Sequence, residues 1–412
     1  MLLRNLIAAA LFCASAAHAQ KVDASTLNGK VLLGYQGWFD CPREGSPGWS
    51  HWLRHAPDQP VVDLYPDLSE FDKADLCAVP GLTIAGKQAY LYSAWNPHVV
   101  DRHFQWMQAN GLDGVLVQRF VSDIPRRRRT GDVVLKNIIA AAKAHGRVFA
   151  IEYDVSGANP KTVGQQLMDD WQYLVSDLKI TSEPTYQRHN GKPVVSVWGM
   201  GFLDNHPPDS PTEAKRIIGW FKEQGVTYMG GVPSRWRTLG ADSRKDEGWH
   251  EVYAMMDIIQ PWTVGRYSNE AGADRWKDEV IVGDIAKHPA YMPVVFPGFS
   301  WHNLKHDAKE NAIPRNGGKF LWRQAVNARQ AGATMLKIAM FDEVNEGTAV
   351  MKAVSKRSEA PEQSFWLALD ADGLDLPSDY YLRLSGAITR VFHGKAPANA
   401  EMPKLVAGGG SR

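Results

Sequence analysis

Short apolar runs rich in β-branched residues alternate with longer stretches of helical periodicity along most of the chain. The eight runs are Val31 to Tyr35, Gly114 to Phe120, Arg147 to Tyr153, Pro193 to Trp198, Val226 to Gly230, Met256 to Gln260, Met292 to Phe296 and Thr334 to Phe341. Strands that alternate with helices predict a parallel sheet with crossover helices, and eight strands close a barrel. We therefore predict an α/β fold, a (β/α)₈ TIM barrel with elaborated loops on its catalytic face.

The segments between these runs carry helix start and stop signals. Asn96-Pro97 predicts a cap and a first-turn proline, and Gly111 follows the end of that helix. Apolar residues recur at helical spacing from 135 to 142, before Gly146. A doubly wound open sheet is the alternative, although the first strand is not followed by a glycine-rich phosphate turn.

The N-terminus predicts a secretory signal peptide, since Arg4 precedes an apolar run and Ala17-His18-Ala19 offers a small-residue exit. We predict residues 1–19 as the signal, 20–395 as a single catalytic domain and 396–412 as a flexible C-terminal tail; two domains are the alternative by length. Cleavage near Ala19-Gln20 would give a secreted or periplasmic protein. No other stretch approaches the ~20 apolar residues of a membrane span, so no membrane insertion is expected.

Charge and cysteine content narrow the partners and the compartment. The formal net charge of +1, with 22% charged residues, argues against a nucleic-acid partner. After removal of the signal, Cys41 and Cys77 are the remaining thiols, so either one disulfide or two unpaired buried cysteines is expected. Fifteen tryptophans favour sugar binding, although core packing also accounts for many of them.

Active sites of barrels lie at the carboxyl ends of the strands, so residues just after each strand are candidates for substrate binding. They include Trp38, Gln118, Glu152, Asp154, Trp198, Trp262 and Trp301. The eighth strand end is the densest, with Asp342, Glu343, Asn345 and Glu346 within five positions. One interpretation makes Asp342 a helix cap and the glutamates first-turn residues. The other makes the glutamates catalytic, because crowding raises one carboxyl pKa and leaves one acid beside one base.

The segment Asp-Glu-Val-Asn-Glu-Gly-Thr at 342–348 resembles Asn-Glu-Trp-His-Glu-Gly-Thr of glycoside hydrolase family 99, the endo-α-mannosidase and endo-α-mannanase family within the wider family 71/99-like group. Further similar pieces are Asn96 to Val117, the strand end Ile151-Glu152-Tyr153 and Pro293 to Gly298. The likeness spans most of the predicted barrel, but only the eighth-strand motif is specific.

The resemblance implies a retaining, endo-acting hydrolase of an oligo- or polysaccharide that needs no metal and no organic cofactor. It implies Glu346 as general acid and base, and Glu343 as the base that activates the substrate's own 2-hydroxyl. Glu152 and Tyr35 would hold the sugar, together with the other strand-end candidates. Asp342, Val344 and Asn345 depart from the family's Asn, Trp and His, and Gln118-Arg119-Phe120 replaces a tryptophan-rich stretch. The sugar therefore stays open among mannose, xylose, arabinose and glucose.

Two other functions compete: a non-catalytic glycan-binding barrel, and an inverting glycosidase that uses Glu152 or Asp154 as one acid. Residues 126–129, four arginines in a row, predict a solvated loop or a rim patch for an acidic or phosphorylated glycan. Asp370 to Asp375 predicts a turn in preference to a calcium loop. The pairs His51 with His55 and His302 with His306 lack the acid of a zinc motif, and no Gly-x-Ser-x-Gly turn supports a serine hydrolase.

Overall fold

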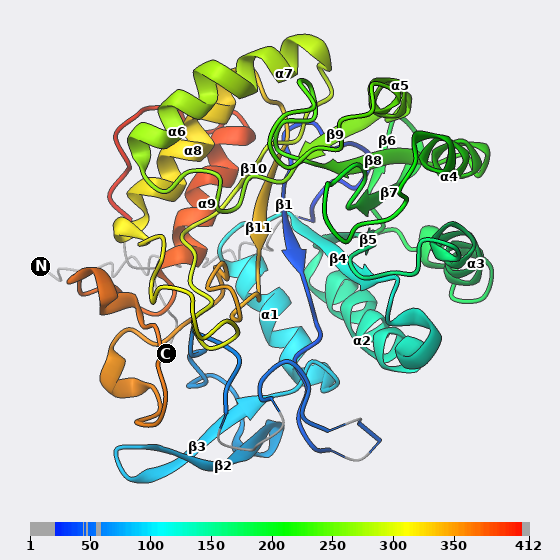
Figure 1. The fold of residues 1–412 in the computed structure, drawn as a ribbon. Coiled ribbons are helices and arrows are strands. Elements are labelled where there is room, and N and C mark those ends of the chain that lie inside the picture. The colour runs from blue at the N-terminus through cyan, green and yellow to red at the C-terminus, as the bar shows by residue number, and fades with distance from the viewer. Residues whose placement is uncertain (1–20, 44, 47, 55–58, 406–412) are drawn as a thin grey trace, which may run out of the picture.

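The computed structural model describes residues 21–43, 45, 46, 48–54 and 59–405 (Figure 1). The predicted signal peptide at 1–19 and the end of the chain at 406–412 lie outside the described residues. Among the described helices none is both long and apolar enough to cross a bilayer.

Eight parallel strands form the barrel, and each lies within one of the eight predicted runs or within two residues of it. They are β1 (Val31–Tyr35), β4 (Gly114–Phe120), β5 (Val148–Asp154), β7 (Lys192–Trp198), β8 (Thr227–Val232), β9 (Ile258–Pro261), β10 (Val294–Val295) and β11 (Leu336–Met340). Their order is β10-β11-β1-β4-β5-β7-β8-β9, so the first and last long strands are neighbours. The predicted fold class is confirmed, and the open doubly wound sheet is wrong.

Two backbone hydrogen bonds bring the ends of this sheet together just before β10 begins. The amide of Ile259 donates to the carbonyl of Ala290 at 3.0 Å, and the amide of Met292 donates to the carbonyl of Ile259 at 2.9 Å. The ring of strands is therefore nearly closed, and the carboxyl ends of all eight strands surround one space.

Helices surround the strands, as Figure 1 shows. They are α1 (Pro97–Ala109), α2 (Ile124–His145), α3 (Val163–Ser176), α4 (Pro211–Glu223), α5 (Gly248–Met255), α6 (Glu270–Trp276), the π-helix η3 (Lys277–Ile281), α7 (Val282–Lys287), α8 (Lys319–Gln330) and α9 (Tyr380–Phe392). Short 3₁₀ turns are η1 (Lys73–Asp75), η2 (Ile180–Ser182), η4 (Asn316–Gly318), η5 (Arg357–Glu359) and η6 (Leu369–Asp372). The predicted signals operate at α1 and α2: the Asn96 side chain accepts from the His98 amide at 3.1 Å, and Gly146 ends α2 with a φ of 60°.

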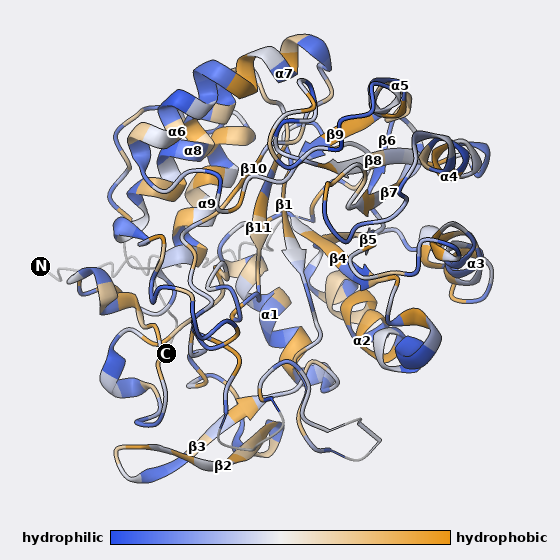
Figure 2. Ribbon diagram, in the orientation of Figure 1, coloured by the Kyte–Doolittle hydropathy of each residue, from blue (hydrophilic) through white to orange (hydrophobic). Residues whose placement is uncertain are grey.

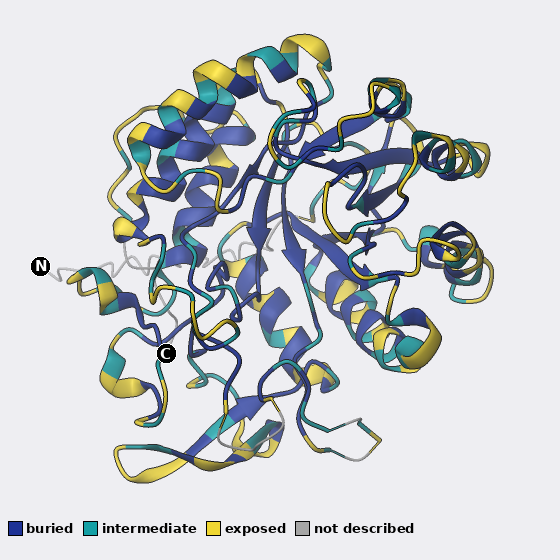
Figure 3. Cartoon of the chain, viewed as in Figure 1, coloured by how far each residue is buried: buried dark blue, intermediate teal, exposed yellow. Residues whose placement is uncertain are grey.

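The core lies inside the barrel and between the barrel and its helices. Every residue of β1, β5, β8 and β11 is buried, because these strands are covered on both faces. Figures 2 and 3 show apolar, buried strands at the centre and helices whose outer faces are polar and exposed. The start of β4 packs so closely on β5 that a Cβ on Gly114 would lie 1.9 Å from the carbonyl oxygen of Val148. Only glycine permits this approach.

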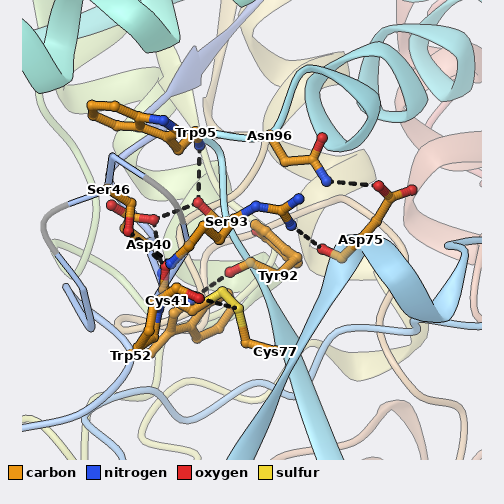
Figure 4. Close-up of a disulfide and its surroundings, with 12 residues drawn as sticks. Asp40, Cys41, Ser46, Trp52, Asp75, Cys77, Tyr92, Ser93, Trp95 and Asn96 are labelled. Carbon is orange, nitrogen blue, oxygen red and sulfur yellow. Dashed lines mark hydrogen bonds between the residues drawn. A yellow bond between two sulfur atoms is a disulfide. The ribbon is translucent and has the colours of Figure 1, made fainter.

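A long loop after β1 carries an antiparallel hairpin, β2 (Leu76–Ile84) and β3 (Lys87–Tyr92), that projects from the barrel in Figure 1. Figure 4 shows the Cys41–Cys77 disulfide that ties the start of this loop to β2, with an S–S distance of 1.99 Å. The Trp52 indole N–H donates to the carbonyl of Tyr92 at 2.8 Å beside it. Of the two alternatives for the cysteines, the disulfide is the one present.

Part of the predicted C-terminal tail contacts the barrel. The Trp322 indole N–H donates to the carbonyl of Asn399 at 3.0 Å, and the Gln330 amide donates to the carbonyl of Ala398 at 3.0 Å. Ala398 and Asn399 therefore lie against α8.

Candidate active site

A cavity of about 210 Å³ opens at the carboxyl ends of the strands. The residues that line it come from β1, β4, β5, β7, β9 and β11 or from the turns directly after them: Gln36, Trp38, Gln118, Phe120, Glu152, Asp154, Ser156, Trp198, Trp262, Lys337, Met340, Glu343 and Glu346. Four carboxylates and one ammonium group share this small space, so their hydrogen bonds determine what each can do.

A buried ion pair lies beside the cavity. The ammonium group of Lys337 donates to Oε1 of Glu152, and neither side chain is exposed. Gln118 donates to the same oxygen, Ser196 Oγ donates to Oε2 at 2.8 Å, and Lys337 also donates to Gln260 Oε1 at 3.4 Å. A buried charge is tolerated when it is paired and hydrogen-bonded in this way. Glu152 is therefore a fixed, charged acceptor.

The segment after β11 is held against the turn after β1. Asp342 accepts the backbone N–H groups of Gln36 and Gly37 at 2.7 and 2.9 Å, and burial raises its pKa to about 6. Residues 341–350 form turns and contain no helix, so the interpretation of Asp342 as a helix cap is wrong. Its two hydrogen bonds tie the segment that begins at Asp342 to the turn after β1.

Both oxygens of Glu343 have N–H donors. Oε2 accepts from the Gln36 side chain at 2.9 Å, and Oε1 accepts from the Asn345 backbone at 2.9 Å. Burial, followed by the charges of Glu346 and Asp342, raises the pKa of Glu343 well above its usual range. The two N–H donors oppose that effect, because hydrogen bonds to a carboxylate favour its ionised form.

Glu346 has the opposite environment. No side-chain hydrogen bond joins it to any described residue, and its carboxyl faces the cavity. Burial, followed by the charge of Asp154, raises its pKa to about 7. Because Glu343 and Glu346 repel each other's charge, ionisation of one favours retention of a proton on the other.

Asp154 is the second carboxyl beside Glu346. One of its oxygens accepts the Ser156 backbone N–H at 2.7 Å, and the Ser156 hydroxyl also favours the ionised form. Burial, reinforced by the charge of Glu152, raises its pKa to about 6. Above that pH Asp154 is ionised and opposes ionisation of Glu346.

Aromatic rings form the walls of the cavity. Trp38 stacks on His51, with ring centroids 3.9 Å apart, and on Phe120 at 5.0 Å. Trp198 and Trp262 meet edge to face at 5.5 Å. The indole N–H groups of Trp38 and Trp198 are buried and have no hydrogen-bond partner among the described residues.

Eight of the twelve predicted site residues line the cavity: Glu343, Glu346, Trp38, Gln118, Glu152, Asp154, Trp198 and Trp262. Four do not. The Tyr35 hydroxyl is fully buried 2.9 Å from His103 Nδ1, and Trp301 lies beside Phe299 at 5.2 Å. The other two are Asp342, bound to the β1 turn, and Asn345, whose amide donates to the carbonyls of Val61 and His51 at 2.7 and 3.0 Å. None of these four residues lines the cavity.

Five residues that line the cavity were not among the predicted site residues, and two of them, Gln36 and Lys337, donate hydrogen bonds to its carboxylates. Gln36 stands at a strand end, but its contact with Glu343 depends on how two distant loops meet. Lys337 interrupts the apolar run 335–340, and a lysine inside a buried strand is a signal for a paired buried charge.

The structure also shows where the arginine run, the Asp370 to Asp375 turn and His302 lie. The arginines 126–129 belong to the start of α2, so the predicted loop is a helix. Asp370, in η6, accepts the Arg357 backbone N–H at 3.1 and 3.2 Å. Nδ1 of His302 lies 2.8 Å from the carbonyl of Ala308. Among the described residues no group of three or more His, Cys, Asp and Glu side chains could hold a metal ion.

The molecule is thus a (β/α)₈ barrel with a carboxylate-rich cavity at the carboxyl ends of its strands. No family model matches the sequence, and no curated protein matches it. Its fold is that of a glycoside hydrolase family 99-like barrel. Two structures of the GH99 endo-α-mannosidase from Bacteroides thetaiotaomicron, one in complex with bis-tris propane, are similar with a TM-score of 0.65 and 18% sequence identity.

These similarities extend over nearly the whole of each molecule. The match covers 90% of this chain and 98% and 99% of the two endo-α-mannosidase chains. A structure described as a glycoside hydrolase-like protein is similar with a TM-score of 0.54 and 13% identity, over 90% of this chain and 96% of that one. At these identities the similarity establishes the fold alone.

Proposed function

We propose that this protein is a glycoside hydrolase that cleaves an oligo- or polysaccharide, with Glu346 as general acid and base and Glu343 as base. One observation carries the proposal: two carboxyl groups of one cavity have opposite hydrogen-bond environments. Glu343 accepts two N–H donors, and Glu346 accepts none from the described residues. An acid and a base side by side in one pocket are the groups that glycosidic bond cleavage requires.

Glu346 supplies the proton. With a pKa of about 7 it is about half protonated at neutral pH and largely protonated below it, and no described side chain accepts a hydrogen bond from its O–H. The proton passes to the glycosidic oxygen as that oxygen leaves the anomeric carbon. The resulting carboxylate then takes a proton from the water that enters at the vacated position.

Glu343 accepts the other proton. Held by Gln36 and by the Asn345 amide, it takes the proton of the substrate's 2-hydroxyl while that oxygen bonds to the anomeric carbon and the leaving oxygen departs. Water then opens the anhydro-sugar, and the C2 oxygen regains its proton from Glu343. Two inversions retain the configuration. This route, and action within the glycan chain, rest on the resemblance of residues 342–348 to family 99.

The rest of the cavity suits one sugar ring. Its volume of about 210 Å³ is below the ~300–1,000 Å³ typical of sites that enclose a drug-sized ligand. Trp38 and Trp198 line it, and their indole rings can contact the apolar face of a sugar. Three donors already occupy Glu152 and its side chain is not exposed, so it is a poor proton carrier. This disfavours an inverting mechanism that uses Glu152.

Glutamine substitutions test the assignment on a panel of plant, fungal and bacterial polysaccharides. Glu343→Gln and Glu346→Gln should each lower kcat by roughly 10²- to 10⁴-fold while sugar binding persists. An activated aryl glycoside, whose leaving group needs no proton, should restore much of the rate to Glu346→Gln and none to Glu343→Gln. Glu223→Gln, which changes an exposed glutamate at the end of α4, is the matched control.

Wild-type turnover that survives in both glutamine variants would refute the roles of these residues. A wild-type protein that binds glycans and releases no product would instead be the non-catalytic binding barrel. The anomer of the first product, recorded by NMR, separates retention from inversion. Export to the periplasm or the medium is also proposed, and the Cys41–Cys77 disulfide supports it because such bonds persist in oxidising compartments. N-terminal sequencing of the mature protein tests export.

A further inference from the structure

A second cavity, of about 90 Å³, adjoins the proposed reaction cavity. Gln36, Trp38, Gln118 and Phe120 line both, so the two spaces share a wall. The second cavity lies between β4 and the start of α2. A group bound there would belong to the same glycan, next to the sugar that occupies the reaction cavity.

This second cavity has an apolar interior and a basic outer side. Its buried lining includes Val117, Val134 and Ile151, whereas Arg127 and Arg128 are half-buried. The arginines therefore form its solvent side. We call it the arginine cavity.

The charges around the arginine cavity are unequal. Arg119 is neutralised by Asp170, with Nε–Oδ2 at 2.5 Å, and by Asp132 at 3.0 Å. Arg128 lies 3.5 Å from the same Asp170, whose charge is already shared. Asp123 is the one carboxylate among the residues that line the cavity, and the lining also includes the guanidinium groups of Arg127 and Arg128.

Arg127 is the group with unused capacity. It donates one hydrogen bond, from Nη2 to Ser50 Oγ at 2.8 Å, and no carboxylate of the described residues lies within 4.0 Å of it. A guanidinium carries five N–H donors in a rigid fork that matches a planar anion. The backbone of Arg127 departs from helical geometry, with φ −128° and ψ 16°, so Arg127 lies outside the regular path of α2.

The reaction cavity has the opposite charge. Glu152, Asp154, Glu343 and Glu346 face a single cation, Lys337, so an anionic sugar is disfavoured there. An anion on the neighbouring sugar would avoid that repulsion and meet Arg127.

We infer that the arginine cavity binds an acidic substituent, a uronic carboxylate or a sulfate ester, on the glycan residue next to the one that is cleaved. The inference rests on the proposed hydrolase function and adds the substrate class. The buried apolar wall suits the C–H face of that sugar, and Arg127 supplies the paired donors. The preferred substrate is thus an acidic glycan whose cleaved residue is neutral.

Matched oligosaccharides test this. Oligosaccharides of a glucuronoxylan are compared with their carboxyl-reduced forms, and sulfated galactan oligosaccharides with their desulfated forms; the two arms separate the sources of the anion. Wild type should favour one acidic form by about tenfold in kcat/KM, the effect expected of a charge-assisted hydrogen bond. Arg127→Gln should abolish that preference, and Arg127→Lys should retain part of it. Arg126→Gln, an exposed neighbour outside the cavity with the same loss of charge, should leave the preference unchanged.

Equal use of acidic and neutral forms by wild type in both arms would overturn the inference, and so would a preference that survives in Arg127→Gln. Loss of the preference in Arg126→Gln would attribute it to overall charge and would also overturn it. If wild type hydrolyses no glycan, the hydrolase proposal fails, and the inference about the arginine cavity is then tested separately by binding. Retardation of the same variants in gels that contain glucuronoxylan or its reduced form then decides the inference by the same criterion.

Discussion

Lys337→Met removes the cation that faces Glu152 and leaves the buried carboxylate with neutral donors only. Methionine keeps the unbranched apolar stem, so the change in packing is small. Neither Lys337 nor Glu152 is exposed, so water does not solvate the Glu152 carboxylate after the ammonium group is removed. Breaking a buried ion pair by removing one partner costs about 3–5 kcal/mol. A domain of this kind is stable by about 5–15 kcal/mol, so the loss is a large share of the total.

A second substitution separates the charge from the packing. Glu152→Gln in the Lys337→Met background removes the uncompensated charge and keeps polar contact with Gln118 and Ser196. We expect the double variant to recover most of the stability lost in the single variant. Together with wild type and the Glu152→Gln single variant, these two variants complete a double-mutant cycle, and its interaction term is the coupling free energy of the pair.

Urea unfolding followed by tryptophan fluorescence measures both variants. Lys222→Met is the matched control, because the Lys222–Asp257 pair is 40% and 36% exposed and such pairs contribute at most about 1 kcal/mol. The reasoning is refuted if Lys337→Met costs no more than the control. It is refuted equally if the double variant is no more stable than Lys337→Met alone.

Three further outcomes follow from the structure. Replacing Cys41 and Cys77 by serine should lower stability by about 3–4 kcal/mol in the chain-entropy estimate for a loop of 36 residues, measured by thermal unfolding against wild type. Asp154→Asn removes a charge that raises the pKa of Glu346, so the alkaline limb of the kcat/KM profile, set near pH 7 in wild type, should move to lower pH; an unmoved limb contradicts the coupling. Gly114→Ala puts a Cβ 1.9 Å from a β5 carbonyl oxygen and should cost about 1–3 kcal/mol or more in urea unfolding, with an unchanged midpoint as the contrary result.

Local patterns in the sequence predict the elements of this fold. Buried strands read as short β-branched runs and helices as a period near 3.6, and eight alternations are compatible with few architectures. The acidic cluster at 342–346 was also visible, because its members are adjacent and follow a strand. These features are encoded within stretches of about ten residues, so no tertiary information was needed to find them.

The electrostatics of the site depend on residues far apart in the chain. Lys337 meets Glu152 across 185 positions, and Gln36 meets Asp342 and Glu343 across 306 and 307. Tyr35 lies at a predicted strand end, yet its hydroxyl turns to His103 and away from the cavity. Periodicity determines which face of an element is buried but not which distant side chains meet there. Only closure of the barrel decided which carboxyl is held by donors and which stands free beside the cavity.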